Sequence, residues 1–230
     1  MKDKINALVS LVGNCFHDLE RYMIHCDENV FEPYSVNTAK LYNCLIIDNR
    51  ATTMIISGQA DVSGPLLYLG NIIEYELNAS IGQAMRMILL GIDMPEYYMK
   101  YYPCDGIYTV PAGRNTINLN REYENPVNHS RKLAANTIGD LCFAYNDMLH
   151  HVNDPILDMI PEELLRIDLN GDYFTYDIVK FGNLRNKAAH AGEVDMDVFD
   201  KAFGLYSRIV EDYMPALAEL KRRLKTPPEK

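Results

Sequence analysis

The strongest constraint on the fold is a series of long segments in which apolar residues recur every three or four positions. This spacing lines apolar side chains along one face of a helix. It runs through residues 3–25, 37–58, 65–90, 129–151, about 175–191 and about 195–225. Strand-like alternation is scarce by comparison. The sequence therefore predicts an all-α fold in which amphipathic helices form a bundle.

Several residues that commonly start, end or interrupt helices mark the boundaries of these segments. Ser63 can cap the third helix, and Gly192 stands where a helix often ends. Pro215 should kink or split the last helix, because its ring removes a backbone donor. Gly70 and Gly82 weaken the third helix intrinsically, so we interpret them as positions where another helix packs closely.

Residues 91–128 break the helical pattern. They are rich in Tyr, Pro, Gly and Asn, which favours an insertion with a short hairpin around Ile107–Val110. We expect residues 1–60 to form N-terminal helices that pack on the bundle. Residues 61–225 then form the bundle with its insertion, and 226–230 a tail, within one structural domain.

The charge balance limits the partners of the chain. It has 22 Lys and Arg against 32 Asp and Glu, a formal net charge of −10, which argues against a protein that coats nucleic acid. Any RNA contact has to come from a local basic spot. The C-terminal basic cluster is best interpreted as a solvated helix end, with a nucleic-acid contact as the alternative. Its members are Lys221, Arg222, Arg223 and Lys225.

The cysteines and the hydropathy point to a cytoplasmic protein. The cysteine number is odd and no CxxC pair occurs, which favours free thiols in a reducing compartment. No run of 18 apolar residues occurs, so no membrane span is predicted. The five cysteines are Cys15, Cys26, Cys44, Cys104 and Cys142.

Two groups of potential metal ligands lack the pattern that a metal site needs. Residues 168–179 begin like a calcium-binding loop, but Tyr173 replaces the required Gly and Val179 the bidentate Glu. We interpret this segment as a turn that leads into a helix. Three histidines lack partners at metal-ligand spacing and are interpreted as surface or helix-end residues: His129, His150 and His151. We expect no metal and no cofactor.

The most informative segment is FGNLRNKAAHAGEVD at 181–195, which contains an R-N-x-x-x-H arrangement. On a helix, Asn183, Asn186, Lys187 and His190 fall on one face, while Arg185 lies about 140° around the axis from His190. The small residues Gly182 and Ala189 nearby would let a second helix approach closely. A different face should be buried, and it carries Phe181, Leu184 and Ala188.

These residue types suit RNA cleavage without a metal, in which the substrate's 2′-hydroxyl attacks the adjacent phosphorus. Histidine titrates near neutral pH, so His190 can remove or supply a proton. Arg185 offers a planar fork to the charged phosphorane, and Asn186 can hold a phosphate oxygen or orient the histidine. We therefore take Arg185, Asn186 and His190 as candidate catalytic residues, and Lys187 and Asn183 as candidate substrate-binding residues.

At this point the chain resembles the HEPN superfamily, helical bundles with an R-x(4–6)-H motif and usually a polar residue after the Arg. The matching residues are Arg185, Asn186 and His190, and residues 136–149 are similar to the helix that often precedes the motif. The resemblance implies a homodimer with a composite cleft and a metal-independent endoribonuclease, an RNA-binding hydrolase. It also implies a prokaryotic toxin or antiviral (phage) defence system, with an antitoxin or effector partner.

Two alternatives stay open. One is a non-catalytic HEPN-like module that binds a nucleotide or a partner protein. The other is a purely structural helical protein, in which Arg185 pairs with Glu193 or Asp195 and His190 simply ends its helix. The acidic balance of the chain favours these alternatives, whereas the Arg-Asn…His set beside Lys187 favours the nuclease.

Overall fold

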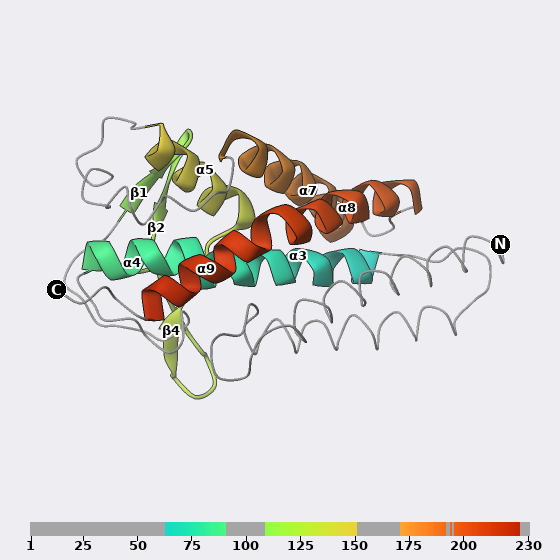
Figure 1. The fold of residues 1–230 in the computed structure, drawn as a ribbon. Helices are drawn as coiled ribbons and strands as arrows, with labels where there is room; N and C mark the ends of the chain where they lie inside the picture. The colour runs from blue at the N-terminus through green and yellow to red at the C-terminus, as the bar shows by residue number, and fades with distance from the viewer. Residues whose placement is uncertain (1–62, 91–108, 151–170, 192–193, 195, 226–230) are drawn as a thin grey trace. The chain divides into compact units, whose positions relative to one another are not determined.

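A computed structural model describes residues 63–90, 109–150, 171–191, 194 and 196–225 (Figure 1). The predicted helices at 3–25 and 37–58, the insertion residues 91–108 and the calcium-like residues Asp168 and Asn170 lie outside this part of the chain. What is described is mostly helical, as predicted, with two small hairpins of strands. None of its helices combines the length and the apolarity that a membrane crossing requires.

The chain falls into two compact units. Among the residues described, the first unit holds 63–73, 176–191, 194 and 196–215, and the second holds 74–90, 109–150, 171–175 and 216–225. The predicted limits at residues 60 and 225 stay predictions.

The predicted helix at 65–90 is present. It consists of α3 (Ser63–Leu77), a π-helical turn η1 (Asn78–Gly82) and α4 (Gln83–Leu90). In the wide turn, Asn78 donates to the Asn136 carbonyl at 2.8 Å and accepts from the Asn136 amide at 2.9 Å. The turn therefore supplies hydrogen-bond partners to the backbone of a distant segment. The apolar face is buried, as the periodicity predicts, through Leu66, Leu69, Ile72, Ile73, Leu77, Ile81 and Met85.

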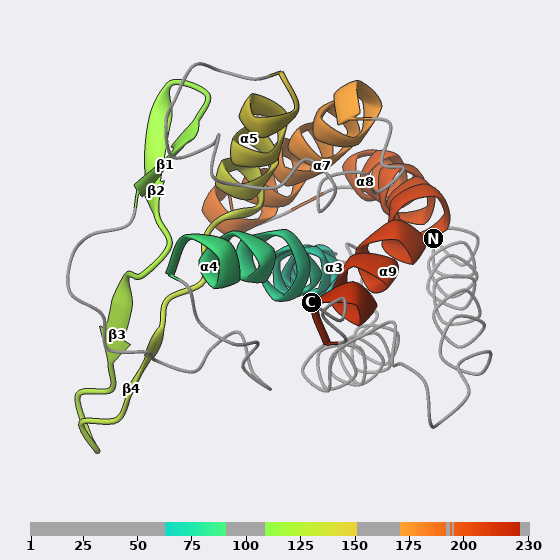
Figure 2. The same cartoon turned by 60° about the vertical axis from the view of Figure 1, so that its left-hand side comes forward.

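Two antiparallel hairpins lie between α4 and the next described helix, and Figure 2 shows them as separate ladders. The first pairs β1 (Thr109–Ala112) with β2 (Asn115–Asn118), and its turn uses Gly113 at a φ of 64°. The second pairs β3 (Glu122–Glu124) with β4 (Arg131–Leu133). The first hairpin confirms, for the residues described, that strands interrupt the helices in the insertion. The second was not predicted.

The predicted helix at 129–151 is wrong at its beginning. Residues 131–133 form β4, and the helix α5 runs only over Ile138–Leu149. The Thr137 hydroxyl accepts a hydrogen bond from the Asp140 amide at 3.2 Å, which caps the first turn. The end of the helix and its buried residues Leu141 and Met148 agree with the prediction.

The C-terminal helices follow the predicted order. They are α7 (Gly171–Ala191), α8 (Met196–Arg208), a π-helical turn η3 (Ile209–Tyr213) and α9 (Met214–Lys225). The interruption predicted at Pro215 is confirmed as a wide turn just before the proline rather than as a break. The Met214 amide bonds to the Ile209 carbonyl, five residues back. Proline has no amide hydrogen of its own to give to the helix.

The interpretation of the C-terminal basic cluster as a solvated helix end is wrong for Lys221. Its side chain is buried, and the ammonium is in direct contact with the Glu76 carboxylate, which is completely buried. Because α9 repeats buried residues every three or four positions, Lys221 falls beside Leu217, Leu220 and Leu224 on the inner face. A lysine on that face needs an anion, and Glu76 supplies it.

Candidate functional site

The polar face predicted for α7 is present. Asn183, Asn186, Lys187 and His190 are all exposed. On the face predicted to be buried, Phe181 and Ala188 are buried and Leu184 is half-buried. Helical geometry therefore places four of the five candidate residues on one solvent-facing surface, as the sequence indicates.

Arg185 is the exception, because its side chain turns away from this face toward α3. It is half-buried, and Nη2 donates to the Asn71 side-chain oxygen at 3.2 Å. Nη1 donates to the side-chain oxygen of the next residue, Asn186, at 3.3 Å. Two amide oxygens thus orient the guanidinium. A guanidinium can form planar, charge-assisted hydrogen bonds with an anion such as a phosphate.

The path of Arg185 over α3 depends on Gly70. A Cβ atom at position 70 would lie 2.5 Å from the Arg185 Cγ and 2.9 Å from its Nε. Both distances are far below a normal contact between nonbonded heavy atoms. The prediction that Gly70 marks a close approach is confirmed, although the neighbour is the candidate catalytic arginine. Gly82 shows the same feature in the second unit, where a Cβ would meet Leu141 at 3.3 Å.

A buried carboxylate anchors α7 two turns before Arg185. The Asp177 side chain accepts from Arg208 Nη1 at 3.1 Å and from the Tyr213 hydroxyl at 3.0 Å. Burial, followed by the hydrogen bond and charge of Asp177, raises the pKa of Tyr213 above its ordinary value. The phenol therefore stays protonated and keeps donating. This cluster ties α7 to α8 and to the wide turn η3, which fixes the helix that carries the motif.

His190 is exposed near the end of α7, and it makes no hydrogen bond with another residue in the part of the chain that the structure describes. Arg185 and His190 therefore face different directions, as their positions around the helix predict. The acidic residues that the structural alternative assigns to Arg185, Glu193 and Asp195, lie outside the described residues, as does Gly192. A single α7 displays the candidate residues without assembling them into one pocket.

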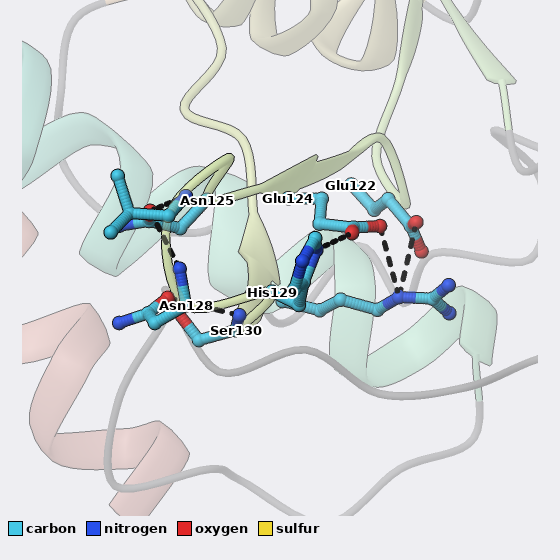
Figure 3. A network of polar contacts seen from close by, with 8 residues as sticks. Glu122, Glu124, Asn125, Asn128, His129 and Ser130 are labelled. Carbon is cyan, nitrogen blue, oxygen red and sulfur yellow. Dashed lines mark hydrogen bonds and ion pairs between the residues drawn. The ribbon is translucent and has the colours of Figure 1, made fainter.

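A second polar cluster lies on the β3–β4 hairpin (Figure 3). The His129 Nδ1 is 2.9 Å from a Glu124 carboxylate oxygen, and Arg131 Nε lies 3.5 Å from Glu122 and 3.7 Å from Glu124. His129 is a surface residue, as predicted, and the sequence did not indicate its contact with Glu124. The Asn125 side chain also accepts from the Val127 amide at 2.8 Å, which closes the hairpin.

This hairpin cluster is best explained as structural. The side chains of His129 and Glu124 are 78% and 41% exposed, and ion pairs so open to water contribute little to stability. Arg131 on β4 lies opposite Glu124 on β3, and a pair of opposite charges across two strands supports the register of the hairpin. Among the described residues, no group of three His, Cys, Asp or Glu is placed to hold a metal ion.

Comparisons with known proteins assign the chain to no family. No protein-family model, no curated protein and no solved structure matched it. Three residues important to the site were missed by sequence reasoning: Asn71, Asp177 and Tyr213. Asn71 and Arg185 are 114 positions apart, and no local pattern signals such a contact. Asp177 carries a signal, because an acidic residue on an otherwise apolar helix face needs a partner.

Proposed function

We propose that this chain is a HEPN-like endoribonuclease that cleaves RNA without a metal, and that it acts as a homodimer. The observation that carries the proposal is the placement of Arg185. Its guanidinium donates to the side-chain oxygens of Asn71 on α3 and of Asn186, and it stands on the helix α7 that also exposes His190. A guanidinium that stabilises charge and an imidazole that transfers protons are the groups that phosphodiester cleavage without a metal needs.

In the proposed reaction, the 2′-hydroxyl oxygen bonds to the adjacent phosphorus while its proton passes to a neutral imidazole of His190. The bond from phosphorus to the 5′-oxygen breaks, and that oxygen takes a proton from an imidazolium. Arg185 stabilises the negative charge on the phosphorane oxygens, and Asn186 hydrogen-bonds one of them. The products are a 2′,3′-cyclic phosphate and a 5′-hydroxyl, and no water or metal enters the step.

A second copy of the chain completes the site in this proposal. The two key side chains of one α7 face different directions, so one helix does not surround a phosphate. Gly182 and Ala189 are small, and Ala189 is exposed, which would let a second α7 approach. In a twofold dimer the partner's His190 serves as the second proton carrier. Toxin or defence activity, restrained by an antitoxin or effector partner in the cytoplasm, belongs to the same proposal.

One observation favours the alternative, a non-catalytic module that binds a nucleotide or a protein. Within the described residues no side chain orients His190. Catalytic histidines are usually fixed by a hydrogen bond to the second ring nitrogen. The dimer answers this objection if the partner chain supplies that bond.

The products of cleavage test the proposal directly. We expect the protein to cut single-stranded RNA in the presence of a chelator and to leave a 2′,3′-cyclic phosphate and a 5′-hydroxyl. DNA of the same sequence should remain intact, because it lacks the attacking hydroxyl. The ends are identified by mass spectrometry of the fragments. Cleavage that chelator abolishes, or products with a 3′-hydroxyl, would contradict the mechanism.

Replacing Gly70 with alanine should lower the cleavage activity while leaving the stability of the fold nearly unchanged. The new methyl group would occupy the space of the Arg185 side chain and force it away from Asn71. We expect cleavage to fall on the order of 10²–10³-fold, the loss expected for Arg185→Ala itself. The free energy of unfolding should change little, since alanine gains about 1 kcal/mol in helix propensity and offsets the displaced arginine.

Gly204→Ala is the matched control. Gly204 is exposed on α8 (Met196–Arg208), and an added Cβ meets no atom within 4 Å. This variant should be slightly more stable than the wild type and fully active. Equal activity of Gly70→Ala and Gly204→Ala would show that Arg185 needs no fixed orientation.

A further inference from the structure

The exposed face of α7 extends beyond the residues that the proposed chemistry uses. Tyr176 and Lys180 precede the motif, and with Asn183, Lys187 and His190 they form a line at alternating spacings of four and three residues. All five are exposed. Spacings of three and four keep side chains on one side of a helix. We name this line the α7 stripe, and it spans about 21 Å along the helix axis.

Tyr176 gives the stripe an open aromatic ring. The residue is 59% exposed, in a protein that buries most of its large described side chains. The Lys180 ammonium lies 5.2 Å from the centre of the ring and donates to the phenol oxygen at 3.3 Å. The ring is thus accessible, and a flexible cation rests against it. Such a ring can accept a flat partner once the lysine swings away.

The ionised groups of the stripe are all positive. Between positions 176 and 190 the acidic residue is Asp177, which is 1% exposed and bonded to Arg208. The exposed charges are Lys180 and Lys187, which lie about 10 Å apart along the axis. The chain as a whole carries a formal charge of −10, so this segment is a local exception. The charge pattern is complementary to a chain of phosphates.

We infer that the α7 stripe binds a single-stranded nucleic acid, with one base stacked on Tyr176 and phosphates on Lys180 and Lys187. Stacking on an aromatic side chain requires an unpaired base, so a strand with splayed bases fits and a duplex does not. The inference rests on the proposed function for the identity of the strand, which is then RNA. Tyr176 selects unpaired segments and directs them along the helix toward His190.

Binding can be measured apart from cleavage with a short, fluorescently labelled single-stranded DNA, which lacks the 2′-hydroxyl. We expect Tyr176→Ala to weaken binding by about 5- to 100-fold, and Tyr176→Phe to retain most of the affinity because it keeps the ring. Lys180→Ala should lower the slope of log affinity against log salt by about 0.7. Lys201→Ala changes the same charge at an exposed position of α8 and should leave that slope unchanged.

Each outcome separates this inference from the proposed function. Oligonucleotide binding that depends on the Tyr176 ring, without RNA cleavage, would support the stripe and contradict the nuclease. Normal RNA cleavage and DNA binding by Tyr176→Ala would overturn the stripe and leave the nuclease intact. Wild-type protein that does not bind the oligonucleotide would also overturn the inference. So would a Tyr176→Ala variant that loses dimer mass in sedimentation while its oligonucleotide affinity stays normal.

Discussion

Replacing His190 with alanine is expected to slow RNA cleavage by at least roughly 10²–10⁴-fold, because one positioned proton-transfer group contributes that much and the variant dimer loses both. The melting temperature should not change, because the side chain is exposed and makes no hydrogen bond within the described residues. Single-turnover cleavage of a labelled RNA gives the rate. His129→Ala is the matched control, since it removes an exposed histidine from the β3–β4 hairpin. Full activity of His190→Ala would contradict the proposed mechanism.

A mixture of two inactive variants tests whether the cleft is composite. Chains with Arg185→Ala keep His190, and chains with His190→Ala keep Arg185. If two chains share one cleft, the cleft of a mixed dimer contains one Arg185 and one His190. The mixture should then cleave RNA faster than either variant alone. No recovery, with dimers present in sedimentation, would show that each chain acts independently and that the two helices do not share a cleft.

Replacing Lys221 with methionine should destabilise the fold by about 3–5 kcal/mol, the usual loss when one partner of a buried ion pair is removed. Methionine fills much of the same volume, so the loss reports the charge rather than a cavity. Glu76 is completely buried, and its carboxylate would lose the ammonium that balances it. Urea denaturation followed by circular dichroism gives the free energy of unfolding.

The double variant Glu76→Met and Lys221→Met separates charge from packing. With both charges gone, most of the lost stability should return, because apolar replacement of a buried ion pair is often neutral. Lys201→Met serves as the exposed control and should change the free energy of unfolding by less than about 0.5 kcal/mol. Wild-type stability of Lys221→Met would show that this lysine reaches water.

The spacing of apolar residues correctly predicted the helices that bury one face. The helix at 63–90 and the faces of α7 agree with the sequence, since burial of an apolar stripe depends on local spacing. The helix predicted from 129 failed because Leu133 fits both a helical pattern and a strand. Thr137 with Asp140 three residues later gave the correct start, a capping signal that the apolar spacing outweighed.

The sequence predicted which candidate residues share the exposed face of α7, but not the contacts of Arg185. Asn183, Asn186, Lys187 and His190 share a face because a helix fixes their directions, whereas the direction of a long arginine is set by what it meets. Arg185 meets Asn71 and Gly70, which lie more than a hundred positions away in the sequence. Lys221 was misassigned for a similar reason, since a basic run at a helix end gives no sign that Glu76 lies beneath it.

The wide turns give two helices one residue more than a regular α-helix holds at that place. An α-helical turn is closed by a bond to the fourth residue back, whereas Met214 bonds to Ile209, the fifth residue back. The turn Ile209–Tyr213 therefore takes up one residue within itself. Deleting exposed Glu211 would leave the number of residues that an ordinary α-helical turn holds, so the helix can continue through this position. The same deletion inside α8, where no such turn takes up a residue, would rotate every later residue by about 100°.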